Sequence, residues 1–328
     1  MRDKQIIDQF GRVHDYLRIS LTDKCNFRCV YCMPNEKMKF APNASLMTAD
    51  EIFNLASTFV DMGINKIRFT GGEPLLRSDS ANIIESVAKL PVKLAITTNG
   101  YFIHEYTDLF KRINLNSINL SIDSLNEQKF NSITQRDHFQ QVNRNIKMLE
   151  ETGFHVKLNC VVMKNFNEDE ILDFVELTRE RNLHVRFIEF MPFKNNQWER
   201  DKVFGYKDIM GKIESSFRVE KLQDKKNDTA KNFRINEGVG TFAVISTITA
   251  PFCQDCNRIR LTATGKLRNC LFAKNESDLL TALRNGEDVE KMIHANFINK
   301  HEKFGGWEDF ESKSESYDSG RSMISIGG

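Results

Sequence analysis

The chain has 328 residues and a mass of 38.0 kDa, enough for one large α/β domain or for one domain with an appended segment. Its 46 Lys and Arg residues balance 45 Asp and Glu residues, which argues against a globally basic protein that binds nucleic acid or a membrane surface. The first twenty residues carry charges throughout, and no run of about 18 apolar residues occurs. We therefore expect a soluble cytoplasmic protein with neither nucleic acid nor a membrane among its partners.

From residue 16 to about residue 217, short apolar strands alternate with amphipathic stretches of helical length. The helical pattern is clear over residues 48–63, where Thr48 is a suitable N-cap and Gly63 a suitable C-terminal stop. Strands separated by helices predict a parallel sheet, either doubly wound or rolled into a partial barrel. The six predicted strands cover residues 16–22, 66–72, 93–100, 117–123, 155–163 and 184–192.

Alternate residues along each predicted strand divide into an apolar set and a polar set. A doubly wound sheet, which helices cover on both faces, would have continuous apolar runs instead. The alternation therefore favours the barrel, with one face toward helices and the other toward a polar lumen. The apolar set is Leu17, Ile19, Leu21, Ile67, Phe69, Leu94, Ile96, Ile118, Leu120, Ile122, Val156, Leu158 and Cys160.

The polar set places six cationic side chains in the predicted lumen. A buried interior holds so much positive charge only together with counter-ions, which a polyphosphate would supply. The alternative, charges at strand edges that reach solvent, suits one or two positions better than six in phase. We therefore expect an anionic ligand inside the barrel. The six residues are Arg18, Lys66, Arg68, Lys93, Lys157 and Arg186.

Seven cysteines fall as two groups of three and the single Cys160, which suits metal or redox chemistry in a reducing compartment better than disulfides. The first cysteine group, Cys25, Cys29 and Cys32, follows the first predicted strand, at the rim where barrel enzymes carry their active sites. No fourth thiolate or imidazole at zinc spacing completes a tetrahedron. Three thiolates can instead hold three irons of a [4Fe–4S] cluster and leave the fourth iron open.

The second cysteine group, Cys253, Cys256 and Cys270, lies in the segment after residue 218, where the βα pattern ends. Half a zinc ribbon is the alternative for this group. Between its cysteines, Arg258 and Arg260 share one side of an extended segment. Two guanidiniums beside an open cluster indicate an anionic or hydrogen-bond-accepting substrate.

Further polar residues stand at the ends of the predicted strands. The second strand ends in "GGEP" over residues 71–74, where the glycines allow close backbone approach and Glu73 can accept a hydrogen bond from an ammonium. Thr97, Ser121 and Met191 stand near the ends of later strands, on the same rim of a barrel.

Several of these stretches resemble known families. With its spacing and with Tyr31 before the last cysteine, the first cysteine group resembles the signature of radical S-adenosylmethionine (SAM) enzymes, and "GGEP" resembles the motif that holds the methionine amine in those enzymes. The stretches "KIRFTGGEP", "RFIEFM", "APFCQDCNRIRLTATGKLRNCLF" and the terminal "IGG" resemble the GTP 3′,8-cyclases of molybdenum cofactor biosynthesis, the MoaA family. This second resemblance runs over nearly the whole chain.

The resemblance implies an α/β fold, with a partial (β/α)6 barrel of the TIM type over residues 1–217 and an extension over residues 218–328 that carries a second cluster and a Gly-Gly tail. It implies two [4Fe–4S] clusters, with SAM on the first and with GTP reaching the open iron of the second through its guanine. The implied GTP contacts are Arg18, Lys66, Arg68, Thr97, Lys157, Arg186, Arg258, Ile259 and Arg260. The implied SAM contacts are Tyr31, Gly71, Gly72, Glu73, Ser121 and Met191, and the implied catalytic residues are Arg258, Arg260, Gly327 and Gly328.

The implied reaction begins with reductive cleavage of SAM to a 5′-deoxyadenosyl radical, which removes the ribose 3′ hydrogen of GTP. The carbon radical closes onto carbon 8 of guanine, and an electron and a proton complete (8S)-3′,8-cyclo-7,8-dihydroguanosine 5′-triphosphate. The implied partners are an electron donor such as flavodoxin or ferredoxin and a cyclic pyranopterin monophosphate synthase downstream. A homodimer is among the assemblies that the sequence allows.

Two other functions fit part of the pattern. A radical SAM peptide or protein maturase with an auxiliary cluster would share the first cysteine group, but it would not need a lumen lined by six cations. A non-catalytic zinc protein that binds nucleic acid is disfavoured by the near-neutral charge and by basic residues that are predicted inside rather than clustered on the surface.

Overall fold

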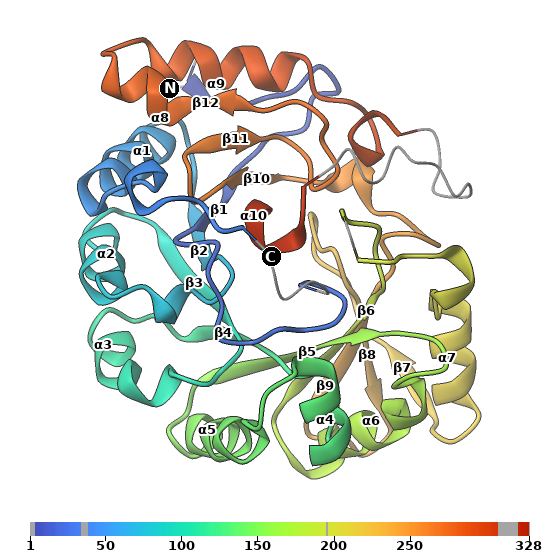
Figure 1. The fold of residues 1–328 in the computed structure, drawn as a ribbon. Helices are drawn as coiled ribbons and strands as arrows, with labels where there is room; N and C mark the ends of the chain where they lie inside the picture. Colours follow the sequence, from blue (N-terminus) through green and yellow to red (C-terminus); the bar gives the residue numbers. More distant parts are fainter. Residues whose placement is uncertain (1–3, 34–38, 195, 308–320, 328) are drawn as a thin grey trace.

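A curved sheet of twelve strands forms the centre of the computed structural model, which describes residues 4–33, 39–194, 196–307 and 321–327 (Figure 1). The strand order is β12-β11-β10-β1-β2-β3-β4-β5-β6-β9-β8-β7. Strands β1 to β6 pair in chain order and in parallel, as expected of successive βα units. They comprise Tyr16–Ser20, Lys66–Thr70, Lys93–Thr98, Ser117–Ser121, His155–Val162 and His184–Glu189. All six predicted strands are present, and each ends one to three residues early because the chain turns into the rim loops.

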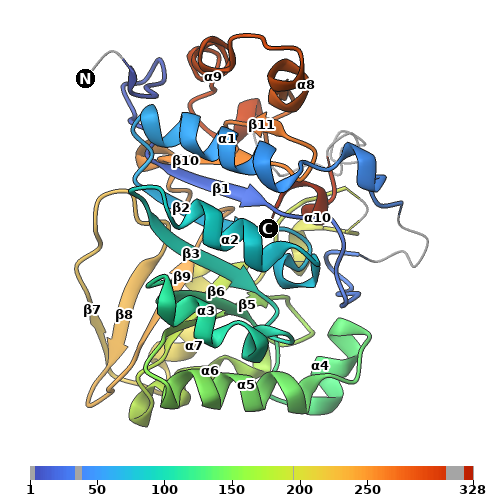
Figure 2. The same cartoon turned by 90° about the vertical axis from the view of Figure 1, so that its left-hand side faces the viewer.

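Helices cover the outer face of these six strands (Figures 1 and 2). The first, α1, begins as predicted: Thr48 Oγ1 accepts a hydrogen bond from the Glu51 amide, and the Glu51 carboxylate accepts one from the Thr48 amide at 2.8 Å. It ends just before Gly63, which has a φ of 96°. The helices are α1 (Ala49–Asp61), α2 (Ser80–Val87), α3 (Thr107–Arg112), α4 (Glu127–Thr134), α5 (Phe139–Glu151), α6 (Ile171–Glu180) and α7 (Tyr206–Glu214).

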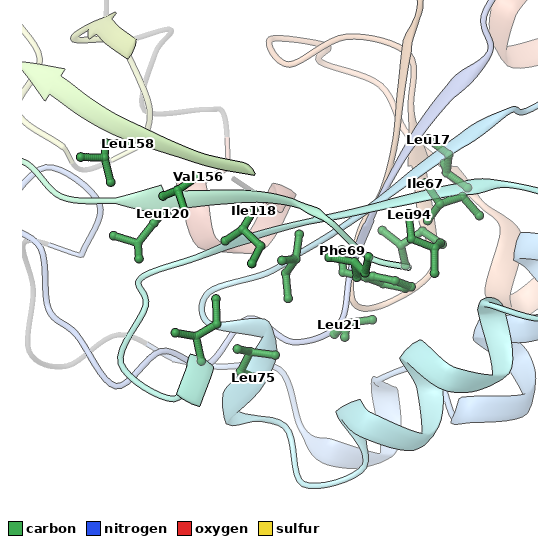
Figure 3. Close-up of a cluster of buried hydrophobic side chains, with 14 of the residues drawn as sticks. Leu17, Leu21, Ile67, Phe69, Leu75, Leu94, Ile118, Leu120, Val156 and Leu158 are labelled. Atoms are coloured by element: carbon green, nitrogen blue, oxygen red, sulfur yellow. The ribbon is translucent and has the colours of Figure 1, made fainter. Parts of the chain in front are cut away.

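The predicted apolar set forms the core between the sheet and the helices (Figure 3). Every member is buried, and Leu94 is the most exposed at 9%. Cys160 belongs to this core, as expected, and its Sγ lies 3.7 Å from the Asp123 carbonyl oxygen. The opposite face of the sheet is therefore left for the polar set.

The segment after residue 217 extends the sheet at both edges. β9 pairs in parallel with β6, and β10 pairs in parallel with β1, so residues distant in sequence border the same lumen. The described elements of this segment are β7 (Val219–Lys221), β8 (Lys231–Ile235), β9 (Thr241–Ile245), β10 (Arg258–Leu261), β11 (Lys266–Arg268), β12 (Ser277–Asp278), α8 (Leu279–Arg284), α9 (Val289–Ile298) and α10 (Met323–Ile326).

The short helix α10 lies in the middle of the curved sheet (Figure 1). Ile324 and Ile326 are 4% and 1% exposed, so this helix is buried within the barrel. Most of the polar tail before it, residues 308–320, lies outside the described residues. None of the helices described is long and apolar enough to span a membrane.

Candidate active site

A cavity of about 750 Å³ lies inside the curved sheet, and small-molecule sites typically measure about 300–1,000 Å³. Both cysteine groups line it. The first group follows the carboxyl end of β1. In the second group, Cys253 and Cys256 precede the amino end of the parallel strand β10, and Cys270 follows β11, which runs antiparallel to β10. Mid-strand residues therefore lie between the two groups. The predicted contact residues that line the cavity are Arg18, Tyr31, Lys66, Arg68, Gly71, Gly72, Thr97, Ser121, Lys157, Arg186, Met191, Arg258 and Arg260.

A row of three guanidiniums crosses the middle of the cavity. Arg18 on β1 is in register with Arg68 on β2 and with Arg260 on β10. The row is deeply buried, since Arg68 and Arg260 are only 3% and 7% exposed. The pKa of Arg18 is lowered to about 10, chiefly by burial and also by the neighbouring charges of Arg68 and Arg258, against the opposing effect of Tyr16.

Two more cations on β5 and β6 face the same space. Burial lowers the pKa of Arg186 to about 9, and the charge of Arg68 adds to this effect. Burial lowers the pKa of Lys157 to about 8, again with contributions from Arg186 and Arg68. These depressed pKa values reflect the unfavourable free energy of burying the cations close together with no anion among them. An anionic ligand placed between them would remove that cost.

Tyr16 lies among these cations and was missed at the level of sequence. Its hydroxyl accepts a hydrogen bond from Arg68 Nε, and Lys66 Nζ lies 4.7 Å from the centre of its ring. Burial alone would raise the pKa of Tyr16, but the charges of Arg68, Arg18 and Lys66 lower it to about 7. Tyr16 stands two residues before Arg18, so strand alternation could have placed it in the lumen.

The loop that carries the first cysteine group packs against the end of β2. Gly72 donates its amide hydrogen to the Thr22 carbonyl at 2.8 Å, and a β-carbon at Gly72 would lie 2.4 Å from the Lys24 carbonyl oxygen. Only glycine permits this approach. The "GG" of the motif therefore joins the cysteine loop to the sheet while the backbone of both glycines lines the cavity.

Glu73 has a structural part in addition to the ligand contact that the motif predicts. Its carboxylate is fully buried and accepts hydrogen bonds from Thr98 Oγ1 at 2.8 Å, the Asn99 amide at 2.7 Å and the Leu75 amide at 3.0 Å. Burial raises its pKa to about 7 despite these bonds. Glu73 does not line the cavity, and its side chain holds the ends of β2 and β3 together. Its contact with the SAM amine stays a prediction.

A second missed residue, Asp123, supports the first cysteine group. Tyr31 Oη donates to Asp123 Oδ2 at 2.7 Å, and Asp123 Oδ1 accepts from the Val161 amide at 2.8 Å. Burial raises the pKa of Asp123 to about 6. Because Tyr31 sits between two cysteines, this bond fixes the cysteine loop to β4 and β5. The signal was the "LSID" strand end, of which only Ser121 was selected.

The second cysteine group lies among cations. Arg258 Nη2 is 3.5 Å from Cys256 Sγ, and Lys300 is buried to 3% exposure nearby. Burial would raise the pKa of Cys256, but the charges of Arg258 and Lys300 lower it to about 6. Arg12 Nη1 donates to the Cys253 carbonyl at 2.7 Å and so fixes the loop from behind. The positive charges of Arg258 and Lys300 therefore favour a negatively charged group at the second cysteine group.

The thiols of both groups fit the donors that a [4Fe–4S] cluster requires. All six cysteines are unpaired and line the cavity. Burial raises the pKa of Cys29, and the charges of Cys25, Cys32 and Asp123 raise it further, which shows that the first group is gathered in one place. Among the residues described, no three His, Cys, Asp or Glu side chains have the geometry of a single-ion site. Three thiolates in each group would bind three irons and leave one iron facing the cavity.

Besides Glu73, the predicted residues Lys93 and Ile259 do not line the cavity. Lys93 is the first residue of β3 and is exposed at the amino end of that strand, outside the cavity. The expected set of six lumenal cations is therefore corrected to five. The Ile259 side chain is fully buried on the opposite face of β10, so only its backbone can approach a ligand. Gly328 lies outside the described residues.

The other glycine of the tail, Gly327, reaches the arginine row. Arg260 Nη1 donates to the Gly327 carbonyl oxygen at 3.3 Å. Gly327 has a φ of 77°, and a β-carbon there would lie 2.8 Å from Thr70 Oγ1 and 2.9 Å from Ser20 Cβ. A residue without a side chain is therefore required at this position.

Two family models match successive parts of the chain: the radical SAM superfamily over residues 19–178 and Molybdenum Cofactor Synthesis C over residues 183–305. The mitochondrial GTP 3′,8-cyclase of Arabidopsis thaliana is 42% identical over 98% of this chain and 83% of the relative. The GTP 3′,8-cyclase of Listeria welshimeri is 38% identical over 90% of each chain. The chain belongs to the GTP 3′,8-cyclase family.

Other relatives of this GTP 3′,8-cyclase family member are longer. Human Molybdenum cofactor biosynthesis protein 1 is 42% identical over 88% of the chain, which spans only 46% of that relative. Among solved structures, Streptococcus suis SuiB bound to S-adenosylmethionine has a TM-score of 0.61 at 15% identity, over 94% of this chain and 71% of SuiB. This likeness shows that the chain has a radical SAM fold.

Proposed function

We propose that the chain is a GTP 3′,8-cyclase that converts GTP to (8S)-3′,8-cyclo-7,8-dihydroguanosine 5′-triphosphate, the first step of molybdenum cofactor biosynthesis. The observation that carries this proposal is that both cysteine groups border one cavity, with the row Arg260, Arg18 and Arg68 between them. Membership of the GTP 3′,8-cyclase family supports the same substrate.

The cations of the cavity are suited to bind the triphosphate. Guanidiniums form paired hydrogen bonds with phosphate oxygens, and lysines add point charges. Arg68 has a fixed direction, because its Nε is bonded to Tyr16 and its Nη1 donates to the Ile96 carbonyl at 2.8 Å. Its remaining nitrogen is left for a phosphate. We assign the triphosphate to Arg18, Lys66, Arg68, Lys157 and Arg186, with Thr97 beside Arg68.

The guanine end of GTP is assigned to the second cysteine group. Arg258 touches Cys256, and Arg260 touches Gly327, so both lie where the base and the tail would meet. A base held there by Arg258, Arg260 and the Ile259 backbone would present carbon 8 toward the centre of the cavity. We infer a second cluster on Cys253, Cys256 and Cys270, with its open iron toward guanine.

SAM is assigned to the other end of the cavity. Tyr31, Gly71, Gly72, Ser121 and Met191 line the cavity beside the first cysteine group. When bound there, a [4Fe–4S] cluster supplies the electron for reductive cleavage of SAM. The chain contributes position: it holds the ribose near SAM and excludes water from the radical path. Proximity of this kind accounts for a large part of such catalysis.

The proposed function also implies an organisation of the chain and a set of partners. We propose that residues 1–217 form the SAM-binding barrel and residues 218–328 the part that carries the second cluster. Electrons would come from a small donor such as flavodoxin or ferredoxin, and the product would pass to a cyclic pyranopterin monophosphate synthase. A cytoplasmic location and a homodimer also remain proposals.

The decisive experiment uses the full chain, reconstituted anaerobically with iron and sulfide. Incubation with GTP, SAM and dithionite should give one 5′-deoxyadenosine for each cyclised nucleotide, detected by mass spectrometry. Without GTP, cleavage of SAM should be slow. A protein that cleaves SAM but modifies a peptide and leaves GTP unchanged would support the maturase alternative. A protein that holds only zinc would support neither the cyclase nor the maturase.

A further inference from the structure

The C-terminal segment enters the barrel past one acidic side chain. Arg321 Nη2 lies 2.5 Å from Glu276 Oε2, and the other carboxylate oxygen of Glu276 pairs with Arg268 Nη1. The Glu276 side chain is 13% exposed and that of Arg321 is 34% exposed. Glu276 therefore bridges two guanidiniums, one from the sheet and one from the tail, at a partly buried position.

Glu276 is held in place without help from the tail. Its partner Arg268 is 4% exposed, and Arg268 Nη2 donates to the Ala273 carbonyl at 2.5 Å and to the Leu271 carbonyl at 3.3 Å. These bonds fix the loop that follows Cys270. A carboxylate fixed in this way is ready to accept the tail guanidinium with little further loss of conformational entropy.

The tail beyond Arg321 is too short to hold itself in place. It forms a single turn, α10, in which the Ser325 amide donates to the Ser322 carbonyl at 3.1 Å. An isolated turn is unstable in water, so it needs contacts at both ends. Gly327 is bound at the inner end by Arg260, and Arg321 provides the outer contact.

The sequence allows only one register for this contact. Arg321 is the last basic residue of the chain, and the nearest one before it is Lys313. Five residues lie between Arg321 and Gly327 in sequence, and the pair with Glu276 fixes how far those residues extend into the cavity. Shifting the tail by one residue would bring a serine or a glycine opposite Glu276.

We propose that Glu276 is the docking residue of the C-terminal segment, and that it positions Gly327 beside Arg260 by holding Arg321. This inference rests on the proposed function, because the cavity that the tail enters is the proposed GTP site. Glu276 acts through the tail and is a positioning residue. Since Glu276 also borders the loop after Cys270, docking of the tail is linked to the surroundings of the second cysteine group.

The primary test is hydrogen exchange of the amides of residues 322–327, measured by mass spectrometry on the full chain without GTP. Arg321→Gln removes the tail guanidinium but leaves the Glu276 to Arg268 pair intact. We expect exchange about three- to tenfold faster than in the wild type, the range for a partly exposed charged pair. Arg321→Lys should be intermediate. Arg112→Gln, which breaks the exposed pair with Glu85 on the outer helices, is the matched control and should change nothing.

Two further comparisons separate docking from general loosening of the loop. Glu276→Gln should have no additional effect on tail exchange in the Arg321→Gln background, because the two residues act through one contact. Raising the salt concentration should speed exchange in the wild type and not in Arg321→Gln. Equal exchange in the wild type and Arg321→Gln, or additive effects of the two substitutions, would overturn the inference.

The activity of the same variants connects docking to chemistry. We expect Arg321→Gln to lower turnover with little change in the affinity for GTP, and an excess of the peptide "RSMISIGG" to restore turnover better than "SMISIGG". These outcomes are distinct from failure of the proposed function. If the wild type does not cyclise GTP, the proposed function is wrong, whereas the exchange experiment still decides whether Glu276 docks the tail.

Discussion

Arg260 on β10 is in register with Arg18 on β1, although the two residues lie near opposite ends of the chain. Parallel pairing of β10 with β1 thus brings the second cysteine group to the lumen formed by the first six strands. Both guanidiniums are buried, and burial is the main cause that lowers the pKa of each. The charges of Arg18 and Arg258 lower the pKa of Arg260 further. The predictions below follow from this arrangement.

The first prediction is that the anaerobically reconstituted chain binds two [4Fe–4S] clusters, about eight irons in total. Replacing Cys25, Cys29 and Cys32 by Ala should halve the iron content and abolish SAM cleavage, because each group holds its cluster independently. Replacing Cys253, Cys256 and Cys270 should also halve the iron but spare SAM binding. Iron and sulfide analysis with electron paramagnetic resonance measures both, and tightly bound zinc in place of iron would contradict the prediction.

The second prediction concerns the triphosphate. Arg68→Ala should weaken GTP binding by about 1.5–3 kcal/mol, or roughly 10- to 150-fold, because a buried charge-assisted hydrogen bond is lost. Calorimetry under anaerobic conditions measures the affinity. Lys93→Ala is the matched control: Lys93 pairs in register with Lys66 on the same sheet but is exposed outside the cavity, so its loss should leave binding unchanged. Equal effects of the two substitutions would remove Arg68 from the site.

The third prediction separates turnover from binding. Arg258→Ala and Arg260→Ala should lower the cyclisation rate more than the affinity for GTP, because these residues lie beside the proposed guanine position and the tail. Arg258→Ala should also change the paramagnetic resonance spectrum of the second cluster, since Arg258 touches Cys256. Normal cyclisation by either variant would show that the assigned role is wrong.

The fourth prediction is a pH dependence of GTP binding. The pKa of Lys157 is about 8 and that of Tyr16 about 7 in the ligand-free cavity. As the pH rises from 7 to 9, Lys157 loses a positive charge and Tyr16 gains a negative one, while a phosphate monoester with a second pKa near ~6 is already ionised. Both changes make the cavity less positive and so weaken its attraction for an anion. The affinity for GTP should therefore fall over this interval. Tyr16→Phe should flatten the fall; an unchanged pH profile in that variant would exclude Tyr16 as its cause.

Much of this arrangement follows from alternation along the strands. Arg18, Lys66 and Arg68 could be placed in the lumen because residues two apart on a strand face the same side. The prediction that Lys93 lies in the lumen was wrong. Alternation along a strand predicts which face of the sheet a side chain is on, but it does not predict whether the end of that strand lies inside the barrel. The extension predicted after residue 217 continues the sheet at both edges, and this could not be predicted because pairing between distant strands is not encoded in any local pattern.

The role of a residue that acts through a distant partner also could not be predicted from the local sequence pattern. The motif predicts a ligand contact for Glu73, but it does not reveal that the carboxylate also accepts hydrogen bonds from Thr98 and Asn99 at the end of the next strand. Asp123 supports Tyr31 across the barrel, and neither sequence neighbourhood reveals the other. The role of Glu276 needed the fold for the same reason, because its partner Arg321 lies near the end of the chain.

The last prediction concerns the end of the chain. Deleting Gly327 and Gly328 should leave the fold, both clusters and GTP binding nearly intact, because the cavity walls come from other segments, but should lower cyclisation strongly. Adding the peptide "SMISIGG" should restore part of the activity. Full activity of the truncated protein would show that the tail is only a frayed end.

A single substitution tests the same point without removing the tail. Gly327→Ala places a methyl group within 2.8 Å of Thr70 Oγ1 on a residue with a φ of 77°, so the end of the tail cannot keep its position beside Arg260. Ser325→Ala is the control, because the hydrogen bonds of the Ser325 hydroxyl to described residues are made within the tail, to Ser322. We expect Gly327→Ala to lose most of its cyclisation rate at unchanged GTP affinity while Ser325→Ala stays near the wild type. Equal rates in the two variants would mean that the position of the Gly327 backbone does not matter for the reaction.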